Sequence, residues 1–297
     1  METSMSDADH HFMRFDEETY LRMNPDVRDA VCDGSFPSGW QHFVTCGFKE
    51  NRSGVPSDVG KAVQDIMEYS PSEVPPEHLR KRVHGDEGLS GFEYVGRIVS
   101  LNSYLAIKSI IELDENCNVL DFGCGCGRVI RYFQRFAENS KLYGTDIDNE
   151  AISWCQQNLS HIGQFIRNSN VPPLPFDDDF FDFVYSISIF THLPEDMQFS
   201  WLEELRRVTK PGGYLLLTTH GEELFHITSK KEIDQFKENG FYYAIGDSTE
   251  GLPDFYQTAF HTIGYVYVNW GKFFEIKNII TKGIAGHQDL ILCRKPD

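Results

Sequence analysis

Hydrophobic residues follow two different periods along this chain. Residues 90–113 carry apolar side chains three or four positions apart, which predicts one long amphipathic helix. From residue 118 onward, short apolar runs of strand length alternate with helical stretches, and this alternation predicts an α/β domain with a parallel sheet. We expect seven strands, at residues 119–122, 141–146, 164–167, 181–186, 214–219, 273–280 and 289–293.

The chain before this alternation has a different organisation. Residues 12–54 hold three short helical segments separated by prolines and glycines, and we treat them as a small α-helical module of unknown role. At about forty residues the module is too small to bury a full core of its own, so we expect it to dock on the larger domain or on a protein partner. Residues 55–89 form a linker with helices, and residues 90–297 form the main domain. Within that domain, residues 221–260 are rich in Phe and Tyr and predict an insertion that closes over a substrate as a lid.

The most informative stretch is residues 118–133, NVLDFGCGCGRVIRYF. Its apolar run ends in Asp121, and Gly123, Gly125 and Gly127 follow at alternate positions before a helical pattern begins. A strand, a tight glycine turn and a helix N-terminus allow the backbone to approach a ligand closely and to offer it unpaired N–H groups. A second acid, Asp146, ends the next predicted strand 19 residues after Gly127. At that distance along the chain a carboxylate is placed to accept hydrogen bonds from ribose hydroxyls.

Composition limits the partners of the chain. Lys and Arg number 27 against 45 Asp and Glu, which gives a net charge of −18. Because phosphates would repel so acidic a chain, we expect neither nucleic acid nor an anionic membrane as a partner. No apolar run reaches the roughly 18 residues of a membrane helix, and the N-terminal residues lack the apolar stretch of a secretory signal. The seven cysteines are scattered and odd in number, which favours a reducing compartment and a cytoplasmic location.

The sequence does not predict a metal site. Cys117, Cys124 and Cys126 lie close together, but their spacing differs from the usual spacing of structural zinc ligands, and no second pair or nearby His completes a set. In a glycine turn, such small side chains are better explained by fitting beneath a ligand. In the N-terminal module, His42 stands between Trp40 and Phe43 and is better explained as a packed helical residue than as a ligand.

The first acid, the alternate glycines, the second acid and the Phe-Asp-x-Val pattern at residues 181–184 resemble the class I S-adenosylmethionine-dependent methyltransferases. The resemblance covers residues 90–297 and has specific motifs from 118 to 219. It implies a Rossmann-like, mostly parallel sheet with helices on both faces and an antiparallel last strand, and S-adenosylmethionine as the cofactor. It also implies methyl transfer to O or N of a small molecule or a glycan. Residues 12–54 resemble a short module with the pattern Y-L-x-x-N-P-D-V, found appended to other bacterial enzymes, including sugar-transferring ones.

The resemblance further implies a cofactor site. Asp121 and the glycine turn would shape the methionine pocket, Asp146 would accept the ribose hydroxyls, and Ile147 would lie against adenine. The guanidinium of Arg97 on the long helix suits either the cofactor's carboxylate or a surface ion pair. A polar residue facing adenine is expected among Asn168, Ser169 and Asn170, with no choice between them. The expected cofactor-binding set is Arg97, Asp121, Phe122, Gly123, Cys124, Gly125, Gly127, Asp146, Ile147, Asn168, Ser169 and Ser186.

A sulfonium methyl donor carries its own leaving group, so the protein mainly positions the acceptor, and a base is needed only where the acceptor loses a proton. His192 and His220 are the favoured bases, because each follows the carboxyl end of a strand, where open α/β sheets bind ligands. His261 and His287 also stand near strands, and a histidine in such a position is more often a structural hydrogen-bonding residue than a base. Four rings of the insertion would wall an apolar acceptor or pack the lid, namely Tyr242, Tyr243, Phe255 and Tyr256.

Two other functions share parts of this pattern. A nicotinamide-dependent dehydrogenase uses a similar sheet, but its fingerprint needs a glycine where Arg128 stands, and it has no use for Asp121. A protein that binds S-adenosylmethionine without catalysis would show the same motifs. Consumption of the cofactor would distinguish an enzyme from such a protein.

Overall fold

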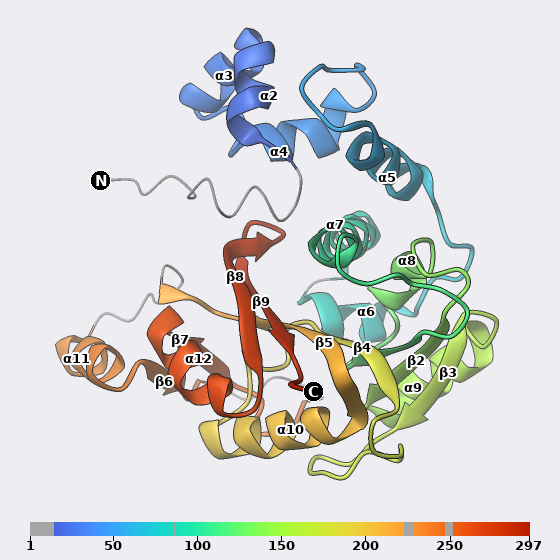
Figure 1. Cartoon of the computed structure of the whole chain (residues 1–297), viewed down its shortest axis with the longest axis vertical. Helices are drawn as coiled ribbons and strands as arrows, with labels where there is room; N and C mark the ends of the chain where they lie inside the picture. The colour runs from blue at the N-terminus through green and yellow to red at the C-terminus, as the bar shows by residue number, and fades with distance from the viewer. Residues whose placement is uncertain (1–14, 86, 223–228, 247–251) are drawn as a thin grey trace.

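The computed structural model describes residues 15–85, 87–222, 229–246 and 252–297 (Figure 1). Its main sheet has seven strands in the order β3-β2-β1-β4-β5-β9-β8. Their bounds are β1 Asn118–Phe122, β2 Lys141–Asp146, β3 Gly163–Arg167, β4 Phe181–Ser186, β5 Thr209–Thr219, β8 Glu275–Ile284 and β9 Gln288–Arg294. The first five in this order pair in parallel, while β9 runs antiparallel to both β5 and β8. The expected Rossmann-like sheet with an antiparallel last strand is confirmed.

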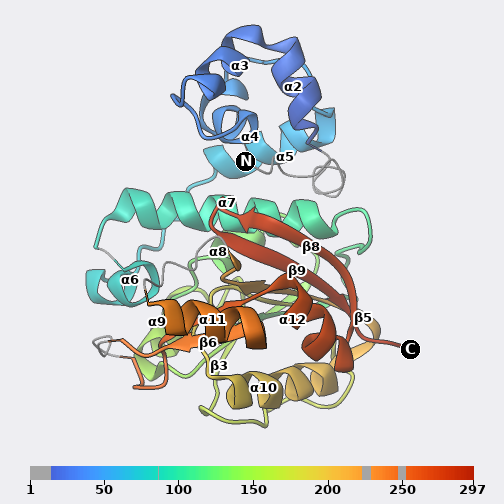
Figure 2. The ribbon, with the colours of Figure 1, turned by 90° about the vertical axis from the view of Figure 1, so that its left-hand side faces the viewer.

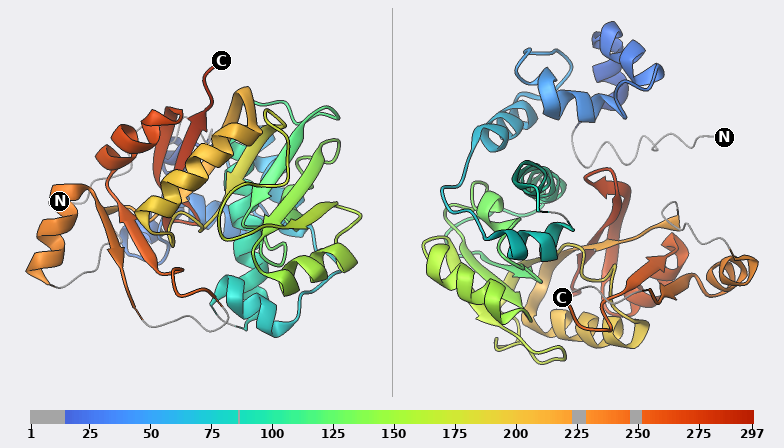
Figure 3. Two further views of the ribbon diagram at one scale, coloured as in Figure 1. Left: turned by 90° about the horizontal axis from the view of Figure 1, so that it is seen from below. Right: turned by 180° about the vertical axis from the view of Figure 1, so that it is seen from behind.

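Helices cover both faces of this sheet. Their bounds are α2 Glu17–Met23, α3 Pro25–Cys32, α4 Gly39–His42, α5 Ser57–Glu68, α6 Glu77–His84, α7 Leu89–Ile107, α8 Ile130–Phe133, α9 Asn149–Asn158, α10 Glu195–Val208, α11 Lys230–Asn239 and α12 Ile263–Asn269. One face packs against α7, α8 and α9 in a single apolar cluster, and the other face packs against α10 and α12. The right-hand view of Figure 3 shows the sheet between α7 and α10. In the described part of the chain, no helix combines the length and the apolar composition needed to cross a bilayer.

The N-terminal helices begin where the sequence signals predict. The side chain of Asp16 caps α2 by accepting a hydrogen bond from the backbone N–H of Thr19, and α3 begins at Pro25. α4 continues directly into a π-helical segment at Phe43–Gly47. Apolar residues of these helices and of α5 share one buried cluster with the outer face of α7, and Figure 2 shows the module stacked on α7. The module therefore completes its core with side chains of the larger domain.

Several boundaries differ from the sequence prediction. The long helix ends at Ile107 rather than near residue 113, β5 begins at Thr209 rather than at residue 214, and β8 extends to Ile284 rather than to residue 280. The insertion also holds a strand that the sequence analysis did not predict, β7 Thr258–His261, and α12 follows it from Ile263. That strand pairs with β6 Phe241–Ala244 in a separate two-stranded antiparallel sheet. The pairing joins residues about 20 positions apart, so local periodicity carries no sign of it.

The predicted lid insertion therefore contains α11, β6 and most of β7, while residues 223–228 and 247–251 of it lie outside the described residues. Its attachment to the sheet is direct: the backbone N–H of Ala259 donates to the carbonyl of Thr191, and the N–H of His261 donates to the carbonyl of His220. The insertion thus follows β5 and returns across the carboxyl ends of β4 and β5.

Candidate cofactor and acceptor site

A cavity of about 820 Å³ lies at the carboxyl ends of β1, β2 and β4. The glycine turn after β1 and the acid that ends β2 form one part of its wall. The rest is formed by residues of α6, α7 and α10, by the segment after β4, by the turn between β8 and β9, and by the insertion. Open α/β sheets bind ligands at this edge, and the volume is in the range of small-molecule sites.

The turn itself requires glycine. Gly123 and Gly125 have φ values of +81° and +53°, in the left-handed region that L side chains rarely adopt. A Cβ at Gly125 would lie 2.7 Å from a methyl carbon of Val83, and one at Gly123 would collide with the side chain of Ile189. The backbone N–H groups of Gly123 and Cys124 donate to the carbonyl of Thr145, at 2.8 and 2.9 Å, which ties the turn to β2.

Asp146 is bound to the same turn from the other side. One carboxylate oxygen accepts a hydrogen bond from the N–H of Gly125 at 2.8 Å, and the other accepts from the N–H of Asp148 at 2.8 Å. Burial raises the pKa of Asp146. Both oxygens keep further lone pairs, and the residue lines the cavity, so it can accept hydrogen bonds from a diol. Ile147 lines the cavity beside it.

A buried acid with one free oxygen stands next to the turn. Asp121 is 3% exposed, and its Oδ2 has no hydrogen-bond partner. Burial raises its pKa to about 8. Arg128, which lines the same cavity, is also buried; its Nε has no partner, and its Nη1 lies 3.4 Å from Nδ1 of His84. The cavity wall thus presents one free carboxyl oxygen and one guanidinium, which suits a ligand carrying both an ammonium and a carboxylate. The sequence reasoning used Arg128 only to exclude a dinucleotide motif and missed it as a site residue.

Among the three polar residues expected near adenine, the structure separates the alternatives. Asn168 and Asn170 line the cavity, whereas Ser169 lines only a shallow neighbouring depression. Asn168 is buried, its Nδ2 donates to the carbonyl of Ser169 at 2.8 Å, and its Oδ1 has no partner. An amide oxygen with a free lone pair can accept a hydrogen bond from an exocyclic amine.

Several expected residues do not line the cavity. Arg97 donates from Nε and Nη2 to the carbonyl of Tyr69, at 3.2 and 3.1 Å, and lies 3.7 Å from a carboxylate oxygen of Glu93. Its guanidinium therefore fastens α7 to the end of α5, and the interpretation as a cofactor ligand is not supported. The Ser186 hydroxyl donates to the carbonyl of Phe122 inside the core, and Gly127 packs beside Leu159. The expected residues that do line the cavity are Asp121, Phe122, Gly123, Cys124, Gly125, Asp146, Ile147 and Asn168.

The two favoured histidines differ in position. His192 lines the cavity, and its Nδ1–H donates to the carbonyl of Gln257 at 2.5 Å, since a carbonyl only accepts. Its ring stacks on Tyr256, with centroids 4.3 Å apart. His220 is buried behind it and does not line the cavity; the two ring centroids lie 5.8 Å apart. Burial lowers the pKa of His192, and burial together with the neighbouring His192 and His287 lowers the pKa of His220 to about 4.

The two other histidines and the four rings of the insertion also divide into residues that line the cavity and residues that do not. His287 lines the cavity, whereas His261 is buried and its Nε2 lies 2.9 Å from the side-chain oxygen of Gln198. Of the four rings expected as walls, Phe255 and Tyr256 line the cavity, and Tyr256 donates from its hydroxyl to the carbonyl of Ser188. The remaining two pack within the insertion: the hydroxyls of Tyr242 and Tyr243 bond Glu232 and the carbonyl of Phe255.

Residues 120–217 match the family described as "Methyltransferase domain", and this range contains the glycine turn and both acids of the cavity. This part of the chain is therefore a methyltransferase domain of the class I, S-adenosylmethionine-dependent type. The cofactor of these methyltransferases is S-adenosylmethionine. The cavity fits its methionine portion, because the glycine turn leaves no room for side chains, Asp121 has a carboxyl oxygen free to accept a hydrogen bond from the ammonium, and Arg128 offers a positive charge to the carboxylate.

Known methyltransferases resemble parts of the chain. It is 31% identical over 118 residues to phthiotriol/phenolphthiotriol dimycocerosates methyltransferase 1 of Mycobacterium ulcerans, covering 40% of this chain and 42% of the relative. It is 27% identical over 168 residues to phosphoethanolamine N-methyltransferase of Plasmodium falciparum, covering 54% and 60%. It is 32% identical over 104 residues to fatty-acid O-methyltransferase of Mycolicibacterium smegmatis, covering 35% of this chain and 37% of the relative. The chain thus spans less than half the length of the two mycobacterial methyltransferases and three fifths of the Plasmodium one.

Solved structures of S-adenosylmethionine-dependent methyltransferases also resemble the chain. One from Methanosarcina mazei is 23% identical with a TM-score of 0.48, covering 64% of this chain and 96% of that one. Another, from Aquifex aeolicus, is 16% identical with a TM-score of 0.45, covering 75% and 100%.

Proposed function

We propose that this chain transfers a methyl group from S-adenosylmethionine to an oxygen or nitrogen of a small-molecule or glycan acceptor, with His192 as the base. The observation that carries this proposal is the position of one histidine. His192 faces the same cavity as the glycine turn, and the carbonyl of Gln257 holds its Nδ1–H, so the lone pair of Nε2 is left free.

The residues around the glycine turn would hold the cofactor. Asp121 would accept a hydrogen bond from the methionine ammonium, and Arg128 would pair with the methionine carboxylate. Asp146 would accept the ribose hydroxyls with the lone pairs that its backbone bonds leave open. Asn168 would face adenine with its unpartnered Oδ1, and Ile147 would pack on the ring. When bound, the cofactor supplies an electrophilic methyl group on a positively charged sulfur.

The acceptor would bind between His192 and the insertion. His192 is neutral near pH 7, because burial lowers its pKa below the ordinary value, so it can take a proton from a hydroxyl or an ammonium. Its bond to Gln257 stabilises the imidazolium that forms. Leu252 and Phe255 from the insertion and Ile189 after β4 add apolar surface to the cavity and would exclude water from the acceptor.

The named relatives support both acceptor atoms. One is named for O-methylation of a fatty acid and another for N-methylation of phosphoethanolamine. The apolar surface contributed by the insertion favours an acceptor with an apolar part, as in the fatty acid. All seven cysteines are free, in keeping with the expected reducing compartment. The cytoplasmic location and the exclusion of nucleic acid as a substrate stay predictions from composition.

The test is a turnover assay with acceptor classes compared at equal concentration. The purified chain is incubated with methyl-labelled S-adenosylmethionine and hydroxylated or aminated acceptors, either with an alkyl or aromatic part or as free glycans. We expect label transfer and stoichiometric S-adenosylhomocysteine with at least one class, and the highest rate with apolar acceptors. Tight cofactor binding measured by calorimetry, without turnover on any class, would instead indicate the catalytically silent binding protein.

A further inference from the structure

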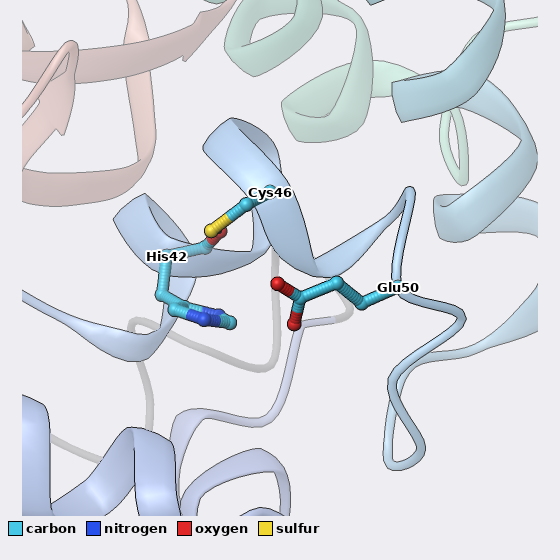
Figure 4. A group of neighbouring side chains, drawn as sticks. All are labelled: His42, Cys46 and Glu50. Carbon is cyan, nitrogen blue, oxygen red and sulfur yellow. The ribbon is translucent and has the colours of Figure 1, made fainter.

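Three side chains of the N-terminal module bring metal-ligating atoms together, far from the cavity. His42 ends α4, Cys46 lies on the π-helical segment that follows, and Glu50 lies in the turn after it. One nitrogen of His42, the sulfur of Cys46 and a carboxylate oxygen of Glu50 all lie within 4.8 Å of one another. Figure 4 shows the imidazole ring of His42 pointing toward the carboxylate of Glu50, with the Cys46 sulfur beside them.

The backbone places these residues on one side of the module. His42 and Cys46 are four residues apart along the helix, and the backbone N–H of Glu50 donates to the carbonyl of Cys46 at 3.1 Å, so Glu50 follows one turn later. The π-helical turn at Phe43–Gly47 widens the helix between His42 and Cys46. Such single turns inside helices are concentrated at functional sites. The side chain of Ser38 caps the start of α4 and so fixes where the first of the three residues falls.

One ring nitrogen of His42 has an oxygen partner, as the second nitrogen of a metal-bound histidine usually has. His42 is buried, and its Nδ1 lies 2.9 Å from the hydroxyl of Tyr20, a fully buried residue. When Nδ1–H donates to that hydroxyl, Nε2 carries the lone pair. Metal-ligating histidines almost always donate their second N–H to an oxygen in this way, which fixes the tautomer and the ring plane.

We propose that His42, Cys46 and Glu50 bind one Zn²⁺ ion, with water as the fourth ligand. Imidazole nitrogen, thiolate sulfur and carboxylate oxygen are the three ligand types of zinc, whereas Mg²⁺ and Ca²⁺ take oxygen ligands almost exclusively. Ligand atoms around a tetrahedral zinc lie about 3.3–3.7 Å apart, given bond lengths of about 2.0–2.3 Å. The three ligand atoms must therefore move closer together from their present 4.8 Å limit, and Glu50 is exposed, so its side chain has room to turn toward the ion.

Charge at the site balances on binding. The thiol of Cys46, whose sulfur lies 3.5 Å from the carbonyl of His42, loses its proton to the solvent when the S–Zn bond forms. The thiolate and the Glu50 carboxylate then neutralise the ion. Arg52, which pairs with Glu50 at 2.7 Å, also pairs with Asp26 at 2.8 Å, so the guanidinium keeps an anionic partner when Glu50 turns to the metal.

Zinc would add a side-chain link between the helix from Gly39 to Gly47 and the turn at Glu50, which backbone hydrogen bonds already join. This link lies next to the point where Arg52 bonds Asp26 of α3. The histidine expected from the sequence to be a packed helical residue is therefore packed on one edge and available to a ligand on the other.

Cobalt substitution tests the proposal on the full chain. The protein is stripped with a chelator under reducing conditions and titrated with Co²⁺, whose bond to a thiolate gives a charge-transfer absorption that carboxylate and imidazole ligands do not give. Zn²⁺ is then added to displace the cobalt. Three proteins are compared: the wild type, C46S, and C32S as the matched control, because Cys32 is an exposed free thiol of the same module.

We expect one Co²⁺ per chain, a charge-transfer band that Zn²⁺ abolishes, and the same band in C32S. In C46S the band should vanish and zinc affinity should fall at least tenfold, with unchanged far-UV circular dichroism showing that the module still folds. In H42Q the affinity should fall similarly. Absence of the band in the folded wild type, a band that persists in C46S, or a band lost in C32S instead would overturn the proposal.

Discussion

The imidazole of His192 and the carbonyl of Gln257 are joined by a 2.5 Å hydrogen bond, although the residues lie 65 positions apart. His192 follows β4, and Gln257 belongs to the insertion, immediately before β7. The bond therefore fixes the tautomer of the proposed base from the insertion that is predicted to cover the acceptor. If the insertion moves, this contact would carry the movement to the orientation of the base.

Replacing His192 by Asn should lower kcat by about 10²- to 10⁴-fold, the usual contribution of a positioned general base. The affinity for S-adenosylhomocysteine should stay within a factor of about two, because His192 is not proposed to contact the cofactor. In the wild type, kcat/KM should decline as the pH falls through the lowered pKa of His192, below 6.5, because protonation removes the base. This acidic decline should be absent from the residual activity of H192N.

The matched comparison is His220→Asn, which alters a histidine packed behind His192 without touching the cavity wall. We expect its activity to stay within about tenfold of the wild type, since it would act only by positioning His192. Steady-state rates with the best acceptor from the turnover assay measure both variants. Full activity in H192N together with a large loss in H220N would move the base to His220.

Arg128→Met should weaken cofactor binding at least tenfold, because the methionine carboxylate would lose its charged partner in a water-poor cavity. Arg97→Met is the control of equal size and charge change. Its guanidinium bonds Tyr69 and Ser70, so we expect unchanged cofactor affinity and a lower unfolding temperature. Calorimetric titration and thermal unfolding of both variants measure the two effects. The opposite pattern, with affinity lost only in the Arg97 variant, would restore the carboxylate role to Arg97.

These two arginines show where sequence reasoning succeeds and fails. The strands and the glycine turn could be predicted, because their apolar runs and glycines are local and the carboxyl ends of parallel strands must meet at one edge. The role of Arg97 could not be predicted, because α7 packs against the sheet on one side and against the N-terminal module on the other. The period of a helix does not show which of two such surfaces a polar residue faces. The signal for Arg128 was present: a charged residue directly after a glycine turn that leads into a buried helix.

The insertion marks the other limit. The pairing of Phe241 with His261 and the hydrogen bond from His192 to the carbonyl of Gln257 join residues that are distant in the sequence. The aromatic-rich composition therefore predicted an insertion but not the strands within it. The same composition left the wall-forming rings undecided. Phe255 and Tyr256 precede β7 and line the cavity, whereas Tyr242 and Tyr243 lie in β6 and bond within the insertion. Composition alone does not distinguish these positions.

Cofactor binding should release close to one proton per chain at pH 7. In the free protein burial raises the pKa of Asp121 to about 8, so its carboxyl is mostly protonated at pH 7. In the complex the methionine ammonium would stabilise the carboxylate, so the proton leaves. Affinity should accordingly rise with pH up to about 8 and then level off. Titration calorimetry in buffers of different ionisation enthalpy counts the proton, and Asp121→Asn should abolish its release; release that persists in this variant would assign it to another group.

Buried neutral histidines should make the fold sensitive to mild acid. Burial lowers the pKa of His261 to about 3, so below pH 6.5 the unfolded chain binds a proton that the folded chain does not, and stability falls as the pH falls. Between pH 6.5 and 5 this one residue should cost about 2 kcal/mol of the free energy of unfolding. His261→Gln keeps an N–H donor toward Gln198 but does not titrate, so the difference in pH slope between wild type and variant isolates the effect from Asp121 and the other titrating groups. Denaturant unfolding at both pH values measures that difference, and equal slopes would mean that His261 is protonated, or exposed to solvent, in the folded protein.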